Sequence, residues 1–148
     1  MIDKNSTKEV LMEAVKEWGG ALEYASKELR GDKDVVLEAI KQGAWLALEY
    51  ASDELKRDCE VVLAAVSKEG YALNYASEEL KDDREFILEA VTENWLALEY
   101  VSTEFKDDKE IVLAAVKQAG YAVEFASEEL RFEMAECWAR LQEGHSGE

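Results

Sequence analysis

The sequence predicts an all-α fold, an α-solenoid of about five helix-turn-helix repeats of about 25 residues with a C-terminal capping helix. The first observation is a repeat, in which an aspartate follows a recurrent serine by six residues and itself recurs at steps of 26, 25 and 25 residues. The second is a wide apolar face after each aspartate, which predicts helices that bury more than one side. The third is the absence of proline, which favours uninterrupted helices. The repeated positions are Ser26, Ser52, Ser77, Ser102 and Ser127 for serine and Asp32, Asp58, Asp83 and Asp108 for aspartate.

The repeat divides residues 1–148, which we expect to form a single domain, into units. The predicted units are about 7–25, 26–51, 52–76, 77–101 and 102–126, followed by a cap at 127–142 and a frayed tail at 143–148. Alternate units resemble each other more than adjacent units do, because Trp45 and Trp95 occupy a slot that is glycine in the other units. Duplication of a block of about 50 residues explains that pattern.

Each unit is expected to contain a long helix, a short helix and a tight helical turn. The aspartate, or Thr7 in the first unit, is a suitable N-cap for the long helix, and the serine is a suitable cap for the turn. Three glycines are expected to end long helices as left-handed C′ residues: Gly19, Gly70 and Gly120. The short helix carries a recurrent aromatic residue, at Tyr24, Tyr50, Tyr75, Tyr100 and Phe125. We interpret these rings as a packed aromatic spine, with stacking on bases or sugars as the alternative.

The last unit departs from the repeat. Glu133 replaces the capping aspartate. Glu136 and Arg140 are polar residues on the helix face that would contact a following unit. Cys137, Trp138 and Leu141 are expected to keep the inner row apolar, as in the capping unit of a solenoid. The register therefore predicts that Cys137 is buried, whereas Cys59, in a slot otherwise filled by lysine or arginine, is predicted to be an exposed free thiol.

The net charge of −17 constrains the partners. It disfavours direct binding to nucleic acid or to an anionic membrane surface, and it favours a protein partner with a basic surface. The apolar runs are far shorter than the roughly 20 residues needed to span a bilayer. The N-terminus lacks the pattern of a secretory signal, so we expect a cytoplasmic site of synthesis. A monomer is the favoured state.

The unit from Glu54 to Ser77 resembles a repeat family of bacteria and protists, the domain of unknown function numbered 4116. The resemblance covers about residues 7 to 130 and rests on several slots that recur in step. It implies no catalytic residues. Some members of the family belong to bacteria that live inside eukaryotic cells, which implies delivery to a host cell for those members. The departures are Trp45 and Trp95 at the glycine slot and one inserted residue near Gly43.

No pattern in the sequence predicts enzymatic chemistry, a metal site or a cofactor. The recurrent Asp-x-Glu pairs, such as Asp83 with Glu85, are better explained as helix caps with a negative first turn than as ligands. His145 is the only histidine and lies in the tail. One histidine and two cysteines of opposite predicted exposure do not make a zinc site.

The candidate partner-binding residues are Trp45, Trp95, Glu38 and Glu89. The two tryptophans lie two units apart, so they are expected on one side about 16–20 Å from each other, either as partner anchors or as fillers of the gap left by the missing glycine. The first functional hypothesis is a non-enzymatic acidic repeat module that binds a basic protein surface. The alternative is an acidic inhibitor or nucleic-acid mimic that blocks the basic cleft of an enzyme, as a bacterial effector or its regulator does.

Overall fold

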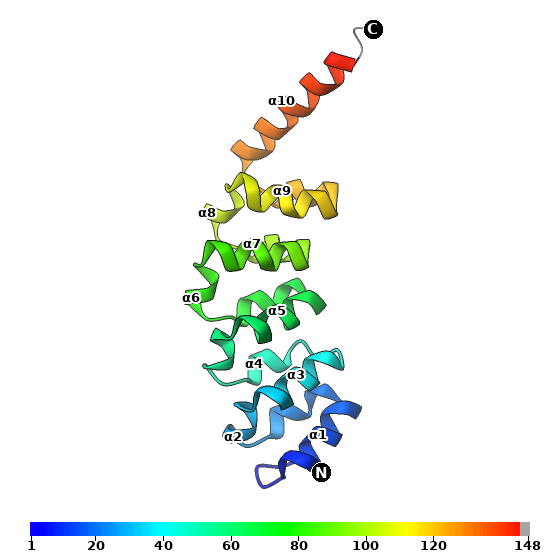
Figure 1. Cartoon of the computed structure of the whole chain (residues 1–148), viewed down its shortest axis with the longest axis vertical. Helices are drawn as coiled ribbons and strands as arrows, with labels where there is room; N and C mark the ends of the chain where they lie inside the picture. The colour runs from blue at the N-terminus through cyan, green and yellow to red at the C-terminus, as the bar shows by residue number, and fades with distance from the viewer. Residues whose placement is uncertain (146–148) are drawn as a thin grey trace.

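The computed structural model describes residues 1–145 as an elongated stack of helical units, with the N-terminus at one end and the last helix at the other (Figure 1). No strand occurs in this described range. The prediction of an all-α repeat solenoid is therefore confirmed. The helices of that range include none with the length and apolarity to cross a bilayer.

The long helices stack on one another in chain order (Figure 1). The aspartate caps are confirmed: the carboxylate of Asp58 accepts a hydrogen bond from the Val61 N–H at 3.2 Å, and that of Asp83 from the Phe86 N–H at 3.1 Å. These bonds satisfy donors that have no partner inside the helix. The long helices are α1 (Lys8–Glu17), α3 (Lys33–Lys41), α5 (Cys59–Lys68), α7 (Arg84–Glu93) and α9 (Lys109–Gln118).

The short second helices form another column beside the long ones. Four are 3-10 helices, η1 (Gly19–Tyr24), η3 (Gly70–Tyr75), η4 (Trp95–Tyr100) and η5 (Gly120–Phe125), and one is α-helical, α4 (Ala47–Tyr50). Successive members of this column are in contact. Their aromatic residues therefore lie one above another along the stack.

The prediction of left-handed glycines at the helix ends is wrong. Among the described residues, positive φ occurs only at Gly43, with φ 91°, in the inserted segment. The chain instead turns through an extended residue before the glycine, such as Glu69 with φ −151°. Gly70 is needed for a different reason, because a Cβ there would lie 2.7 Å from the backbone of Leu96 and Ala97 in the next unit.

The third element of each unit is a single helical turn, and the serines at 52, 77 and 127 also link their turns to the preceding unit. The Ser77 hydroxyl accepts the Leu80 N–H at 3.3 Å, while the Ser77 backbone N–H donates to the carbonyl of Lys56 at 2.9 Å. Ser127 makes the same backbone bond to Lys106. These turns are α2 (Lys27–Arg30), η2 (Leu55–Arg57), α6 (Glu78–Lys81) and α8 (Thr103–Lys106).

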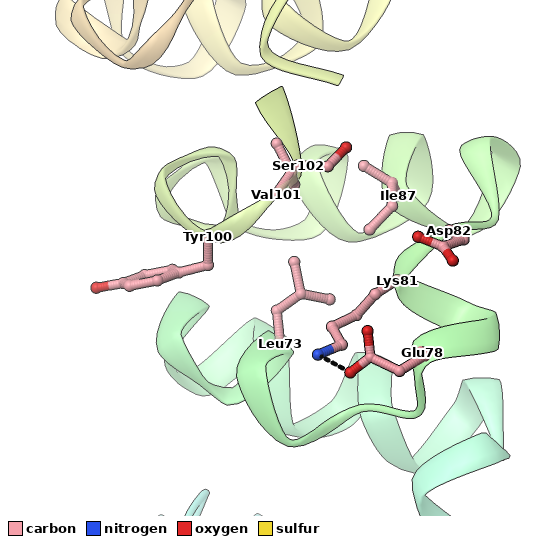
Figure 2. Close-up of a pocket in the computed structure, with 8 residues that line it drawn as sticks. All are labelled: Leu73, Glu78, Lys81, Asp82, Ile87, Tyr100, Val101 and Ser102. Carbon is pink, nitrogen blue, oxygen red and sulfur yellow. Dashed lines mark ion pairs between the residues drawn. The ribbon is translucent and has the colours of Figure 1, made fainter. Parts of the chain in front are cut away.

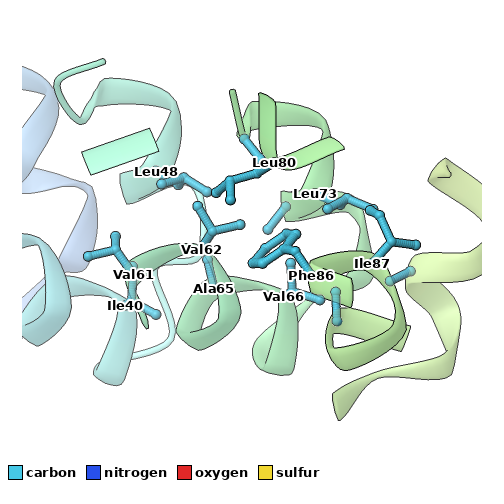
Figure 3. Close-up of a cluster of buried hydrophobic side chains, with 14 of the residues drawn as sticks. Ile40, Leu48, Val61, Val62, Ala65, Val66, Leu73, Leu80, Phe86 and Ile87 are labelled. Atoms are coloured by element: carbon cyan, nitrogen blue, oxygen red, sulfur yellow. The ribbon is translucent and has the colours of Figure 1, made fainter. Parts of the chain in front are cut away.

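The core runs as a continuous apolar seam between units. Figure 3 shows Leu73 of η3 between Val62 and Val66 of α5 and Ile87 of α7. Leu73 and Ile87 are completely buried. Each helix thus contacts both of its neighbours, as the wide apolar faces predicted.

The last helix, α10 (Glu128–His145), does not cover the end of the stack. The turn that starts at Ser127 runs directly into the following helix, because Glu133 replaces the aspartate whose extended backbone breaks the chain in other units. The continuous helix leaves the column at an angle (Figure 1). The predictions for its inner row are wrong: Cys137 is exposed, and Trp138 and Leu141 are 66% and 58% exposed.

The predicted frayed tail at 143–148 begins within a helix, because α10 continues to His145. Residues 146–148 lie outside the described range.

Both thiols are expected to react quickly with a thiol reagent in the native protein, at comparable rates. Cys59 and Cys137 are both exposed, so neither is protected by packing. Stopped-flow reaction with an aromatic disulfide, using Cys59→Ser and Cys137→Ser to assign the phases, measures the two rates. A Cys137 that reacts only after unfolding would contradict the position of α10.

Candidate partner-binding surface

Trp45 anchors an aromatic cluster on the column of second helices. Its ring centroid lies 5.8 Å from that of Tyr71 in an edge-to-face contact and 6.4 Å from that of Tyr75. Tyr71 in turn contacts Tyr100 of the following unit, with centroids 5.2 Å apart. The cluster therefore spans three consecutive units.

Trp95 anchors an equivalent cluster two units later. Its ring contacts Tyr121 at 4.9 Å and Phe125 at 6.2 Å between centroids. The side chain of Gln118 holds the backbone of Trp95 in place. Its side-chain oxygen Oε1 accepts the Trp95 backbone N–H at 3.3 Å, while its side-chain Nε2 donates to the Val91 backbone carbonyl at 2.9 Å. We call the seven residues of the two clusters the aromatic ridge: Trp45, Tyr71, Tyr75, Tyr100, Trp95, Tyr121 and Phe125.

The ridge is partly packed and partly open. Trp45 and Trp95 are half-buried and pack against the core. Tyr71 and Tyr121 are 40% and 63% exposed. Each tryptophan thus fills space in the stack and also presents ring surface, so the two readings of these residues are not mutually exclusive. The predicted spine holds in part, since Tyr50, Tyr75, Tyr100 and Phe125 pack against the core whereas Tyr24 is exposed.

A row of carboxylates runs along the same column. A glutamate directly precedes the recurrent aromatic residue in every unit except the third, which has Asn74. The side chains of this row are exposed, and no lysine or arginine of the described residues forms an ion pair with them. We call them the carboxylate row: Glu23, Glu49, Glu99 and Glu124.

The carboxylate row lies beside the ridge rather than apart from it. Burial, followed by the charges of Glu49 and the neighbouring Tyr71, raises the pKa of Tyr75. Burial, followed by the charge of Glu99, also raises the pKa of Tyr100. The surface therefore combines ring faces with uncompensated negative charge, which suits a cation that carries apolar neighbours.

The acidic residues at the starts of the long helices are in a different state. Lys33 binds Asp58 at 2.9 Å and Glu60 at 2.6 Å in the next unit, and Arg84 binds Asp108 at 2.7 Å in the same way. The hydrogen bond from Lys33 lowers the pKa of Asp58, and that from Arg84 lowers the pKa of Asp108. These carboxylates are structural, as the capping interpretation predicted.

Cys59 interrupts this ladder of ion pairs. It occupies the slot of Lys33 and Arg84, so Asp83 and Glu85 have no basic partner among the residues of the described range. Replacing Cys59 with lysine is expected to stabilise the fold by about 0.2–1 kcal/mol, the usual range for an exposed ion pair. Chemical denaturation at low and high salt, with Cys59→Ser as the control, measures this gain. Equal stabilities of the lysine and serine variants at low salt would contradict it.

Glu38 and Glu89, the other two candidates from the sequence, lie on the long-helix column. They occupy the same slot of α3 and α7. The Glu38 carboxylate accepts a hydrogen bond from the Gln42 side chain at 2.8 Å, and Glu89 is exposed. The structure thus joins each tryptophan to aromatic residues of the next unit, whereas the hydrogen bond of Glu38 is to Gln42 at the end of its own helix.

Two polar side chains of one hollow in the stack already have structural partners. This hollow, of about 210 Å³, lies between α6 and η4 and is lined by Leu73, Lys81, Tyr100 and Ser102 among others (Figure 2). Lys81 pairs with Glu78 at 2.6 Å, and the Ser102 hydroxyl accepts the Phe105 N–H as a helix cap. Both polar groups already have structural partners. Within residues 1–145, no cluster of histidine, cysteine, aspartate and glutamate has the arrangement of a metal site.

A family model described as "Domain of unknown function (DUF4116)" matches most of the chain, at residues 7–56, 45–81, 58–106 and 83–131. Three of these matches each cover about two predicted units. No curated protein and no solved structure matches the chain.

Proposed function

Since the chain belongs to the DUF4116 family, whose description assigns no activity, we propose on the geometry alone that it is a non-enzymatic module that binds a basic segment of a partner protein. The bound segment lies along the aromatic ridge, between Trp45 and Phe125. The tryptophans supply apolar contact, and the carboxylate row supplies charge. Aromatic residues in partly desolvated positions are the commonest sources of binding energy at protein interfaces.

The carboxylate row carries the proposal. Glu60 and Glu110, at the starts of α5 and α9, have cations from the neighbouring unit, whereas Glu49 and Glu99 have none and adjoin half-buried tyrosines. Uncompensated charge at repeated positions beside ring faces raises the local concentration of a positive partner and fixes its register. Of the candidate residues from the sequence, the proposal uses Trp45 and Trp95, and it assigns the charged contacts to the carboxylate row in place of Glu38 and Glu89.

The test uses a fluorescein-labelled peptide of nine lysines and two matched double variants. Glu49→Gln with Glu99→Gln removes two charges from the ridge, and Glu38→Gln with Glu89→Gln removes two charges from the long-helix column. Fluorescence anisotropy at two salt concentrations gives the affinities. We expect the Glu49 and Glu99 double variant to raise the dissociation constant by a factor about five times larger than the Glu38 and Glu89 double variant does. Charges in contact with the bound peptide act more strongly than distant charges, which salt screens.

The other outcomes of this test also have definite meanings. A larger effect of the Glu38 and Glu89 pair would place the basic partner on the long-helix column. Equal effects of the two pairs would favour the second candidate function, an acidic inhibitor or nucleic-acid mimic, which the net charge of −17 supports. Such a protein acts through its overall field, so each lost charge counts equally wherever it lies.

A further inference from the structure

We infer that the segment bound on the aromatic ridge is a polyproline II stretch with a lysine or arginine at every third residue. The inference rests on the proposed function and specifies its ligand. It follows from the spacing expected between the stacked second helices, which carry the carboxylate row, and from the ring surfaces beside that row.

The spacing of the row selects the conformation of the ligand. Successive second helices are in contact, and helices in contact lie about 8–10 Å apart. A polyproline II helix rises about 3.1 Å per residue with three residues per turn, so every third side chain points the same way at intervals of about 9 Å. An α-helix repeats at about 5.4 Å per turn, and alternate residues of a strand lie about 6.8 Å apart. Of these three repeats, the polyproline II repeat is the one that falls within the roughly 8–10 Å expected for one carboxylate per unit.

The ring arrangement agrees with a ligand that lies across the ridge. Trp45 with Tyr71, and Trp95 with Tyr121, are in edge-to-face contact at 5.8 and 4.9 Å, which leaves no space between the rings for a cation. The outer faces of half-buried tryptophans and exposed tyrosines remain. Grooves lined by aromatic rings are a common site for polyproline II segments, because that helix is already ordered before binding.

The third unit modifies the expected pattern. Asn74 stands where the other units have a carboxylate, and it is exposed. The cations opposite Glu49 and Glu99 are therefore separated by six ligand residues, with an uncharged position tolerated between them. Adding a carboxylate at Asn74 completes the row.

The experiment compares two labelled peptides of identical composition. One contains four Lys-Pro-Pro repeats, and the other contains four lysines followed by eight prolines. Both have the same length, the same eight prolines and the same charge, and they differ in the order in which lysines and prolines follow one another. We expect the periodic peptide to bind about tenfold more tightly at physiological salt, as several exposed charge pairs formed together would give.

Two single substitutions on the protein complete the test. Asn74→Glu is expected to strengthen binding of the periodic peptide about threefold to fivefold and to leave the block peptide nearly unchanged. The control is Ala64→Glu. Ala64 lies on α5 in the slot that Glu38 fills on α3 and Glu89 fills on α7, so the substitution adds the same charge on the long-helix column. We expect it to affect both peptides equally.

The failures are distinguishable. Equal affinities of the two peptides, with no selective gain from Asn74→Glu, would overturn the polyproline II inference and leave the proposed function standing. If neither peptide nor the nine-lysine peptide binds at low salt, the proposed function itself fails.

Discussion

Replacing Leu73 with alanine is expected to lower the free energy of unfolding by about 2–5 kcal/mol, the range for a leucine truncated in a packed core. Leu73 is fully buried on η3 and faces side chains of both α5 and α7 (Figure 3). The cavity would thus lie at the junction of neighbouring units. Because each unit of a solenoid is stabilised mainly by its neighbours, loss at a junction weakens the units on both sides.

The matched control for Leu73→Ala is Val123→Ala. Val123 occupies the same slot of η5, next to the end of the stack, and it is only half-buried. We expect it to cost less than about 1.5 kcal/mol, since fewer atoms lose contacts. Urea denaturation followed by circular dichroism gives both values. Similar losses for the two substitutions would argue against a core that runs continuously through the interior units and opens at the end.

The features that could be predicted from the sequence are those fixed by local spacing. The period of the serine and aspartate slots gave the units, and the caps at Asp58, Asp83 and Ser77 form as expected. A cap needs only an oxygen acceptor placed two or three residues before an unpaired N–H, so neighbours along the chain decide it. The exposure of Cys59 was also predicted correctly, because its slot is charged in the adjoining units.

The errors concern features that depend on which surface a neighbouring unit covers. Cys137 aligns with Val112 and Ile87, but alignment determines burial only if the last helix packs on α9. That packing requires a break before Glu133, and the sequence there continues the helix. The role of Gly70 was misassigned for a similar reason, because the backbone that approaches it belongs to the next unit.

The candidate surface was predicted in part. Recurrence two units apart identified Trp45 and Trp95, and their ring contacts are with Tyr71 and Tyr121 of the following units. The carboxylate row was missed because glutamate is abundant throughout an acidic chain. Its signal was the Glu-Tyr pair that recurs in three units, Glu23 with Tyr24, Glu49 with Tyr50 and Glu99 with Tyr100. Only the structure distinguishes these carboxylates from those that are ion-paired.

Replacing Gly70 with alanine is expected to destabilise the protein by about 1–3 kcal/mol, as overpacking in a close-packed interior does. The added Cβ would lie 2.7 Å from the Ala97 nitrogen and the Leu96 carbonyl carbon, and 2.9 Å from the Leu96 Cβ. Two of these are backbone atoms, which move only if η4 shifts away from η3. Since η4 also carries Trp95, this shift would disturb the aromatic ridge as well as the core.

Gly120→Ala provides the matched control, because Gly120 begins η5 as Gly70 begins η3. No atom lies within 4 Å of a Cβ built at Gly120, since no further unit covers that face. Its φ is not in the positive range, so alanine can adopt the same backbone conformation. We expect Gly120→Ala to be neutral or to stabilise the protein by about 0.4–1 kcal/mol, because alanine lowers the conformational entropy of the unfolded chain. Thermal and urea denaturation of the two variants give opposite signs if the glycine is required by the approach of the next unit. If both substitutions destabilise equally, the requirement would instead be conformational and would not depend on a neighbour.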